Sequence, residues 1–312
     1  MRLLSAISII LFLSSINASK IEFDRYTIDD GLSQNTVYKV FQDSRGYIWL
    51  GTQGGLDRFN GYEFKHYEHE SNDSTSIVNG WIRAINEDED GLLWLGTVGG
   101  NLGWFDPYDE IGGEIDLFAD HPDFDRPGYI YDILFHGDYI FLTTLGSGLC
   151  RYNRKDGSTL WYSSDSTSKH YIKDRVFTNV YSISEDKILL GDRSIIILNT
   201  ETNEHVEPYN ELIEKEIGVP FDSIKVSSIT QTNDRKILIG TWSDHGLIIL
   251  DTESEGVSQF FPLPPDPDSG KVPRTMIGEI TIDRFNKLWM PVFNVGLATF
   301  DMTEEEFELH LP

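Results

Sequence analysis

Side chains of the kinds that bind sugars occur in this sequence next to strand-like runs. Indole and phenol rings offer flat apolar faces, while amide and guanidinium groups form hydrogen bonds with hydroxyl groups. Trp242 and His245 lengthen a loop that is only Gln53-Gly-Gly55 in the first copy of a repeat described below. Residues of these types also occur in loops between strands, and together they form the candidate set Asn35, Asn79, Trp81, Tyr129, Arg193, Trp242, His245 and Arg274. They are candidates for binding an oligosaccharide or another small ligand, with the alternative that Trp81 and Tyr129 only pack within the fold.

The sequence marks no catalytic residue and predicts no cofactor. A glycosidase needs two carboxylates that project into one cavity, but nothing distinguishes such a pair among the 51 acidic residues. Neither a G-x-S-x-G nucleophile elbow nor an H-E-x-x-H zinc motif is present. The histidines are scattered, and we expect His66, His69, His136 and His310 on the surface.

Charge and cysteine content exclude further classes of function. The chain has 312 residues and a formal net charge of -26, which repels phosphate backbones and anionic membrane surfaces. We therefore expect no nucleic-acid partner. Cys150 is the single cysteine, so an internal disulfide and a cysteine-based metal site are excluded, and we interpret it as a packed strand residue.

The candidate residues are positioned by a unit that recurs along the chain. Asp43 to Gly61 reads DSRGYIWLGTQGGLDRFNG and Glu89 to Asp106 reads EDGLLWLGTVGGNLGWFD, so that Trp94 repeats Trp49. Weaker copies occupy residues 139–152, 187–199, 236–251 and 287–301. A step of roughly 40 to 50 residues built from strand-like runs is typical of propeller blades. Six copies are visible.

Each copy divides into four strands. In the first copy we expect them at residues 35–42, 47–52, 56–59 and 62–67, the last with the alternation of an outer strand. Gly51, Gly96, Gly191 and Gly240 end the second strand at equivalent points, which indicates close backbone approach or a bend. Asp88-Glu-Asp-Gly91 has part of a calcium-loop pattern but lacks the later ligands, so a plain turn is favoured and no metal site is predicted.

The predicted fold is all-β, a β-propeller of four-stranded antiparallel blades. A single such sheet has two apolar faces, so neighbouring sheets must stack around an axis. The six blades are expected at approximately 31–70, 76–120, 128–165, 177–210, 226–263 and 275–312.

The start of the chain predicts a seventh blade. Residues 21–26, IEFDRY, match the outer strand 62–67, YEFKHY, and lack three strands before them. In a closed propeller such an orphan strand completes the last blade, but the sixth copy already has an outer strand at 306–310. We therefore expect an incomplete seven-bladed propeller, the front part of a longer protein. Six blades sealed by residues 21–26 would contradict this.

Residues 1–19 are predicted to be a signal peptide. Met1-Arg2 precede an uncharged run from Leu3 to Ile16, and small residues follow, with cleavage expected after Ala18 or Ser19. Residues 20–312 would then be an exported propeller.

The segment GLSQNTVYKVFQDSRGYIWLGTQGGLDRFNG, Gly31 to Gly61, resembles the two-component regulator propeller repeat. The resemblance spans nearly all of residues 20–312 and is highest in the first two copies. It implies the N-terminal part of the periplasmic sensor region of a Bacteroidetes hybrid two-component system. In that family two seven-bladed propellers precede an immunoglobulin-like domain, a membrane helix, a histidine kinase, a receiver and a DNA-binding module. The resemblance further implies sensing of carbohydrate fragments, downstream kinase modules as partners, a homodimer, and anchoring in the inner membrane.

Two other classes of function stay open. Propellers also serve as protein-interaction scaffolds and host carbohydrate-active enzymes, so fold alone does not decide. A sensor predicts a membrane helix downstream, an enzyme predicts turnover by the isolated propeller, and a scaffold predicts neither.

Overall fold

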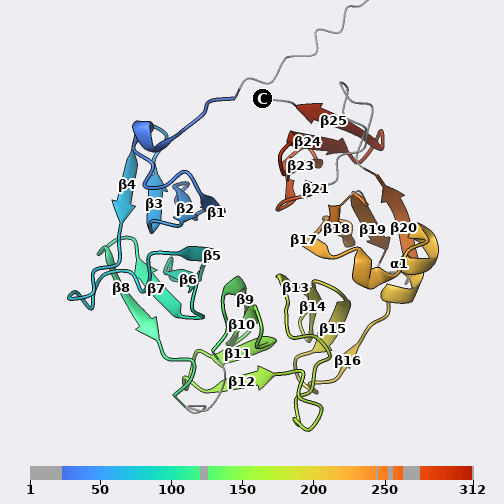
Figure 1. The fold of residues 1–312 in the computed structure, drawn as a ribbon, viewed down its shortest axis with the longest axis horizontal. Coiled ribbons are helices and arrows are strands. Elements are labelled where there is room, and N and C mark those ends of the chain that lie inside the picture. The colour runs from blue at the N-terminus through green and yellow to red at the C-terminus, as the bar shows by residue number, and fades with distance from the viewer. Residues whose placement is uncertain (1–22, 120–125, 244, 252–255, 263–274, 311–312) are drawn as a thin grey trace, which may run out of the picture.

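Six antiparallel sheets surround one axis in the computed structural model, which describes residues 23–119, 126–243, 245–251, 256–262 and 275–310 (Figure 1). Each sheet has four strands in sequence order from the axis outward. The predicted all-β propeller with six four-stranded blades is therefore confirmed. The predicted signal peptide lies outside the described residues.

The blades follow one another along the chain. Blade 1 consists of β1 (Val37–Gln42), β2 (Ile48–Thr52), β3 (Leu56–Phe59) and β4 (Phe64–Tyr67). Blade 2 consists of β5 (Ile82–Glu87), β6 (Leu93–Thr97), β7 (Leu102–Asp106) and β8 (Ile111–Ile115). Blade 3 consists of β9 (Ile130–His136), β10 (Tyr139–Thr144), β11 (Leu149–Asn153) and β12 (Thr159–Tyr162).

The second half repeats this plan. Blade 4 consists of β13 (Asn179–Ser184), β14 (Lys187–Gly191), β15 (Ile195–Asn199) and β16 (His205–Val206). Blade 5 consists of β17 (Val226–Gln231), β18 (Lys236–Ser243), β19 (Leu247–Asp251) and β20 (Gly256–Phe261). The short β21 (Thr275–Met276) pairs with the end of β18 and leads into blade 6, which consists of β22 (Thr281–Ile282), β23 (Lys287–Val292), β24 (Gly296–Asp301) and β25 (Glu306–His310).

Three short helical segments were not predicted. They are η1 (Ile28–Asp30), α1 (Asn210–Ile217) and η2 (Phe221–Ser223). Helix α1 lies in the connection from blade 4 to blade 5, and its Ile213 is fully buried in the apolar cluster between those blades. A helix of two turns is too short for its periodicity to stand out in the sequence, and it is stabilised by tertiary packing.

The core lies between blades. The apolar clusters each join one blade to the next, as where Trp49 of blade 1 packs with Ile82 and Phe105 of blade 2. The predicted close backbone approach is confirmed at Gly51, whereas at Gly96 the close neighbour is a side chain. A Cβ on Gly51 would lie 2.8 Å from the carbonyl oxygen of Ile82, and one on Gly96 would lie 2.6 Å from Cγ2 of Ile130.

The ring is open between blade 1 and blade 6 (Figure 1). Within the part of the chain that the structure describes, no strand pairing joins these two blades. Residues 21 and 22 of the predicted orphan strand are not described, and residues 23–26 form no strand. Tyr26 instead packs on its own blade, with its ring 5.0 Å from that of Phe59 and 5.7 Å from that of Phe64. The seventh blade stays a prediction.

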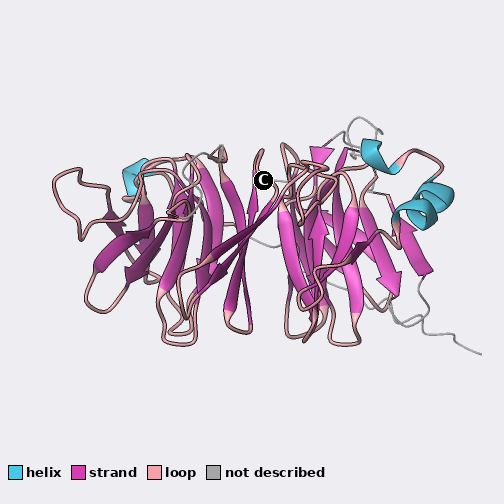
Figure 2. Cartoon of the chain, turned by 90° about the horizontal axis from the view of Figure 1, so that it is seen from below, coloured by secondary structure: helices cyan, strands magenta, loops and turns pink. Residues whose placement is uncertain are grey.

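The two faces of the disc carry different loops. Because the strands alternate in direction, the connections between blades and the loops between second and third strands share one face, which we call the connection face. The opposite face, the turn face, carries the tight turns between first and second strands. Figure 2 shows the helical segments gathered on one face of the disc, as expected for α1 and η2 in the connection from blade 4 to blade 5 and for η1 in the segment that leads into blade 1.

Candidate functional site

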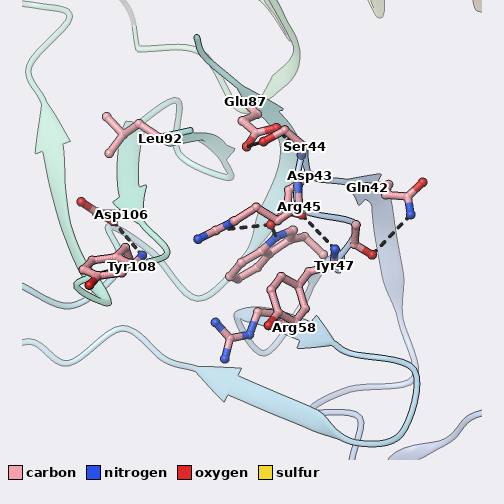
Figure 3. Close-up of polar contacts among 12 residues, drawn as sticks. Gln42, Asp43, Ser44, Arg45, Tyr47, Arg58, Glu87, Leu92, Asp106 and Tyr108 are labelled. Carbon is pink, nitrogen blue, oxygen red and sulfur yellow. Dashed lines mark hydrogen bonds and ion pairs between the residues drawn. The ribbon is translucent and has the colours of Figure 1, made fainter. Parts of the chain in front are cut away.

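The repeated tryptophan is a structural group. The carboxylate of Asp43, in the turn between β1 and β2, accepts hydrogen bonds from the backbone N–H groups of Arg45 and Tyr47 and from Nε1 of Trp49, at 3.0, 2.8 and 2.9 Å (Figure 3). Blades 2 and 6 repeat this arrangement, with Trp94 and Trp289 donating to the equivalent aspartates. The motif that first attracts attention in the sequence therefore builds a turn.

The same geometry explains Asp88, where calcium was a minor alternative. Its carboxylate accepts the backbone N–H groups of Asp90 and Leu92 and Nε1 of Trp94. Oxygens that accept N–H donors are not free for a cation, so the plain turn is the better description. Among the described residues no group of three or more His, Cys, Asp or Glu side chains could hold a metal ion.

Polar and aromatic side chains meet instead where the inner strands begin, near the axis on the connection face. In blades 1, 2, 3 and 5 the pairing register shifts by one residue at the second position of the inner strand segment. Such a bulge re-aims the side chain of the extra residue. The residues at this position are Tyr38, Arg83, Tyr131 and Ser227.

Three tyrosine rings surround the guanidinium of Arg83. Its Cζ lies 4.5 Å from the ring centre of Tyr38 in blade 1, and 4.9 and 5.1 Å from those of Tyr129 and Tyr131 at the start of blade 3. We call these four residues the Arg83 cage. Cation–π contacts at such distances each contribute about 0.5–1 kcal/mol at accessible sites. The cage links three successive blades through one cation.

An ion pair lies beside the cage and joins the first and last blades. Nζ of Lys39 contacts both carboxylate oxygens of Glu279, at 2.7 and 2.8 Å. Asp132 of blade 3 keeps some exposed surface but lies deep among the inner strands, and this desolvation raises its pKa to about 6, although Lys39 acts in the opposite direction. Desolvation lowers the pKa of Lys39, but Asp132 and Glu279 outweigh it, so the net shift is upward.

A second set of charged and aromatic groups lies at the start of blade 5. Nζ of Lys225 lies 5.9 Å from the ring centre of Trp242, whose side chain is 45% exposed. Burial raises the pKa of Asp192, while the charges of Lys225 and Arg193 oppose that shift. The backbone N–H of Trp242 also donates to the carbonyl of Lys225, which fixes the start of this loop.

The structure places the predicted binding residues on the connection face in separate groups. Asn79 bonds the carbonyl of Val98 and the N–H of Trp81, and Val98 forms a bridge with Tyr129, so these three predicted residues are neighbours. Trp242 and Arg193 belong to the blade 5 group. Asn35 accepts the N–H of Ile28 and holds the N-terminal segment. His245 is half-buried in the lengthened loop, and Arg274 lies outside the described residues.

Sequence reasoning missed most of the charged groups around the axis. Tyr38, Lys39, Arg83, Asp132 and Glu279 are in strands or next to them and belong to no motif. The sequence carries no clear signal for them, because these residues differ from one copy of the repeat to the next.

The expectation that the histidines lie on the surface is wrong for His136, which is buried, and holds only in part for His66 and His310, which are half-buried. His136 is buried and contacts Oγ of Ser182 and the carbonyl of Glu185. His66 is half-buried against Asp57, and His310 contacts Thr299. These rings complete contacts within or between blades, whereas His69 is exposed as predicted.

Cys150 is fully buried on β11, as the sequence predicts for a packed strand residue, and burial raises the pKa of its thiol. No helix among the described residues is both long enough and apolar enough to cross a membrane.

Comparison with known proteins adds family information to this geometry. The model of the two-component regulator propeller matches residues 31–54 and 76–99, at the starts of blades 1 and 2. The chain carries two-component regulator propeller repeats. The resemblance seen in the sequence is thereby confirmed where it was highest.

A second comparison finds a relative that is similar over a short segment. A histidine kinase of Formosa agariphila is 43% identical over 82 residues, which cover 25% of this chain and 6% of that protein. The chain thus spans only a small part of the length of this relative.

Solved structures with similar folds come from signalling and from catalysis. The extracellular domain assigned to a hybrid two-component system of B. thetaiotaomicron has a TM-score of 0.71 and 20% identity, over 92% of this chain and 36% of that one. Virginiamycin B lyase from Staphylococcus aureus has a TM-score of 0.60 and 14% identity, over 88% and 83%. At these identities both show the propeller fold alone.

Proposed function

We propose that this chain is the ligand-recognition propeller of an exported sensor in a hybrid two-component system, and that it binds carbohydrate on its connection face. The regulator propeller repeats, the histidine kinase relative and the fold shared with an extracellular sensor domain support the sensor part. The carbohydrate part is supported by the side chains of the connection face.

One observation carries the carbohydrate part. Of the seven tryptophans, Trp81 and Trp242 are the exposed ones, at 37% and 45%, and both lie on the connection face. The motif tryptophans, by contrast, are bonded into turns. Exposed indole faces beside amide and ammonium groups provide the stacking surface and the hydrogen bonds that sugar recognition needs.

The test is a binding screen on the purified chain. A panel of neutral and acidic oligosaccharides is titrated by calorimetry, and thermal unfolding is followed in parallel because a bound ligand stabilises the folded state. We expect one class of sugar to bind, with at least tenfold lower affinity in Trp81→Ala or Trp242→Ala. Tyr108→Ala is the matched control, because this tyrosine is 85% exposed on the turn face and should not change the affinity.

Loss of binding in the control as well, or equal binding by all variants, would contradict a site on the connection face. A panel without any bound sugar would contradict the carbohydrate part and leave the sensor part to be judged on its own.

The sensor part has a separate test, which is to sequence the gene beyond the codon for Pro312. We expect further propeller, a membrane helix and kinase modules, with the propeller exported and the whole protein forming a homodimer anchored in the inner membrane. A stop codon at that point would favour an exported scaffold instead.

A further inference from the structure

Arg83 has unused hydrogen-bonding capacity. Its guanidinium carries five N–H donors, yet it forms no hydrogen bond and no ion pair with any residue that the structure describes, and its recorded contacts are the three tyrosine rings. In a chain with 51 acidic and 25 basic residues, an arginine without a carboxylate partner is unexpected. The residue is half-buried, so part of it remains accessible to solvent.

The cage fixes the guanidinium before any ligand arrives. Rings from blade 1 and blade 3 both lie within 5 Å of Cζ of Arg83, at 4.5 and 4.9 Å, and the rings of Tyr129 and Tyr131 lie 5.8 Å apart. A planar fork held in one orientation loses less freedom when it forms two parallel hydrogen bonds to a carboxylate. The phenol hydroxyls of the cage make no hydrogen bond to a described residue either, so they are available to a ligand.

The guanidinium of Arg83 suits a planar anion. Lys39 is already paired with Glu279, whereas Arg83 forms no ion pair with a described residue. A carboxylate presents two coplanar oxygens that match two parallel N–H groups of a guanidinium, so a carboxylate is the anion that this fork fits.

We propose that the Arg83 cage binds the carboxylate of an acidic sugar, a uronate, with the tyrosine hydroxyls contacting the hydroxyl groups of the ring. The sugar part of this inference rests on the proposed function, whereas the anion site rests on the cage alone. The ligand class follows from the combination of a guanidinium fork surrounded by aromatic rings and phenol hydroxyls that form no hydrogen bond with a described residue.

The experiment compares matched sugars on the full chain. D-glucuronate and D-galacturonate are titrated by ligand-observed NMR beside D-glucose and D-galactose, which carry a hydroxymethyl group in place of the carboxylate, and acetate serves as the bare anion. We expect each uronate to bind at least tenfold more tightly than its neutral partner. Arg83→Gln should abolish that difference, and Arg83→Lys should retain a part of it, because the charge remains while the fork is lost.

Arg284→Gln is the matched control. This arginine is exposed in the turn between β22 and β23, over the ring of Phe285, and its substitution changes the net charge equally. We expect it to bind uronates as the unmodified chain does. Circular dichroism and the melting temperature establish that each variant is folded. If Arg83→Gln does not fold, uronate binding by Arg83→Lys tests the site instead.

The outcomes separate the two proposals. Equal affinity for uronates and neutral sugars, or unchanged uronate binding by Arg83→Gln, would overturn the cage inference and leave a carbohydrate sensor standing. Acetate binding that equals uronate binding and depends on Arg83 would support the anion site, overturn its sugar specificity and weaken the proposed carbohydrate function. No binding of any of these anions would overturn the inference outright.

Discussion

The same tryptophan has different surroundings in blade 1 and in blade 6. In both blades its Nε1 donates to the turn aspartate at 2.9 Å. Trp49 is fully buried, and its ring lies 5.9 Å from that of Phe105 in the next blade. Trp289 is half-buried, and its ring partner, His310 at 6.3 Å, belongs to its own blade. The motif therefore specifies a local hydrogen bond, while burial depends on the following blade.

A second position shows the same contrast. Gly51 stands where a Cβ would meet the backbone of blade 2, and in blade 6 the equivalent residue is Pro291, which is exposed. Equivalence follows from the register, since each residue comes two positions after the motif tryptophan. Close approach of a next blade favours glycine at this point in blades 1, 2, 4 and 5, while blade 3 has the buried Thr143 there, and blade 6 has no such neighbour among the described residues.

The largest expected effect compares the two tryptophans. Trp49→Ala should lower the free energy of unfolding by about 3–5 kcal/mol, because it leaves a cavity between two blades. Trp289→Ala should cost only about 1 kcal/mol, close to the worth of one hydrogen bond. Urea unfolding followed by circular dichroism measures both. Equal losses of unfolding free energy would show that the tryptophan stabilises the chain through its hydrogen bond and not through packing against the next blade.

The blades were predictable because each copy carries a complete local code. Turn chemistry at Asp43-Ser-Arg-Gly46 and the apolar run after it fix two strands and the hairpin between them. Strands at 56–59 and 306–310 were predicted at their observed bounds. Because every copy follows the same local pattern, its strands and turns can be predicted without knowing which residues are in contact across the fold.

The axial groups were not predictable in the same way. Tyr38, Arg83 and Tyr131 occupy one position of the repeat and differ from copy to copy, so comparison of the copies makes them look like variable surface. They come together only because blades 1 to 3 curve around an axis, and curvature is a property of the assembled ring. The exposed Trp242, in contrast, was found because its loop is longer than the others.

A smaller effect is expected at the glycine position. Gly51→Ala should destabilise the chain by about 1–2 kcal/mol, because the added methyl group forces the inner strand of blade 2 away. Pro291→Ala should change stability by no more than about 0.5 kcal/mol, as expected for an exposed residue. Melting temperatures of both variants test the contrast. A tolerated alanine at Gly51 would mean that the blades adjust more freely than their close packing indicates.

The smallest effect concerns a charged pair that blade 1 has and blade 6 lacks. Asp57 is fully buried on β3 and contacts Nδ1 of His66 at 2.7 Å, while the equivalent residue of blade 6 is Ala298. The hydrogen bond to Asp57 raises the pKa of His66, partial burial opposes it, and the charges of Asp57 and Glu68 add to the rise.

Because the folded pKa lies above the unfolded value of about 6.5, the stabilisation is complete below that pH and is lost as the pH rises through the folded pKa. His66→Gln should therefore cost about 0.5–1 kcal/mol at pH 5.5 and less at pH 9, a modest value because water screens the half-buried ring. Asp57→Asn is the matched variant, since it keeps the histidine and removes the charge. The contrary result is a stability difference between the unmodified chain and His66→Gln that is the same at both pH values. In that case the ring of His66 would stabilise blade 1 through packing, and its charge would make no contribution.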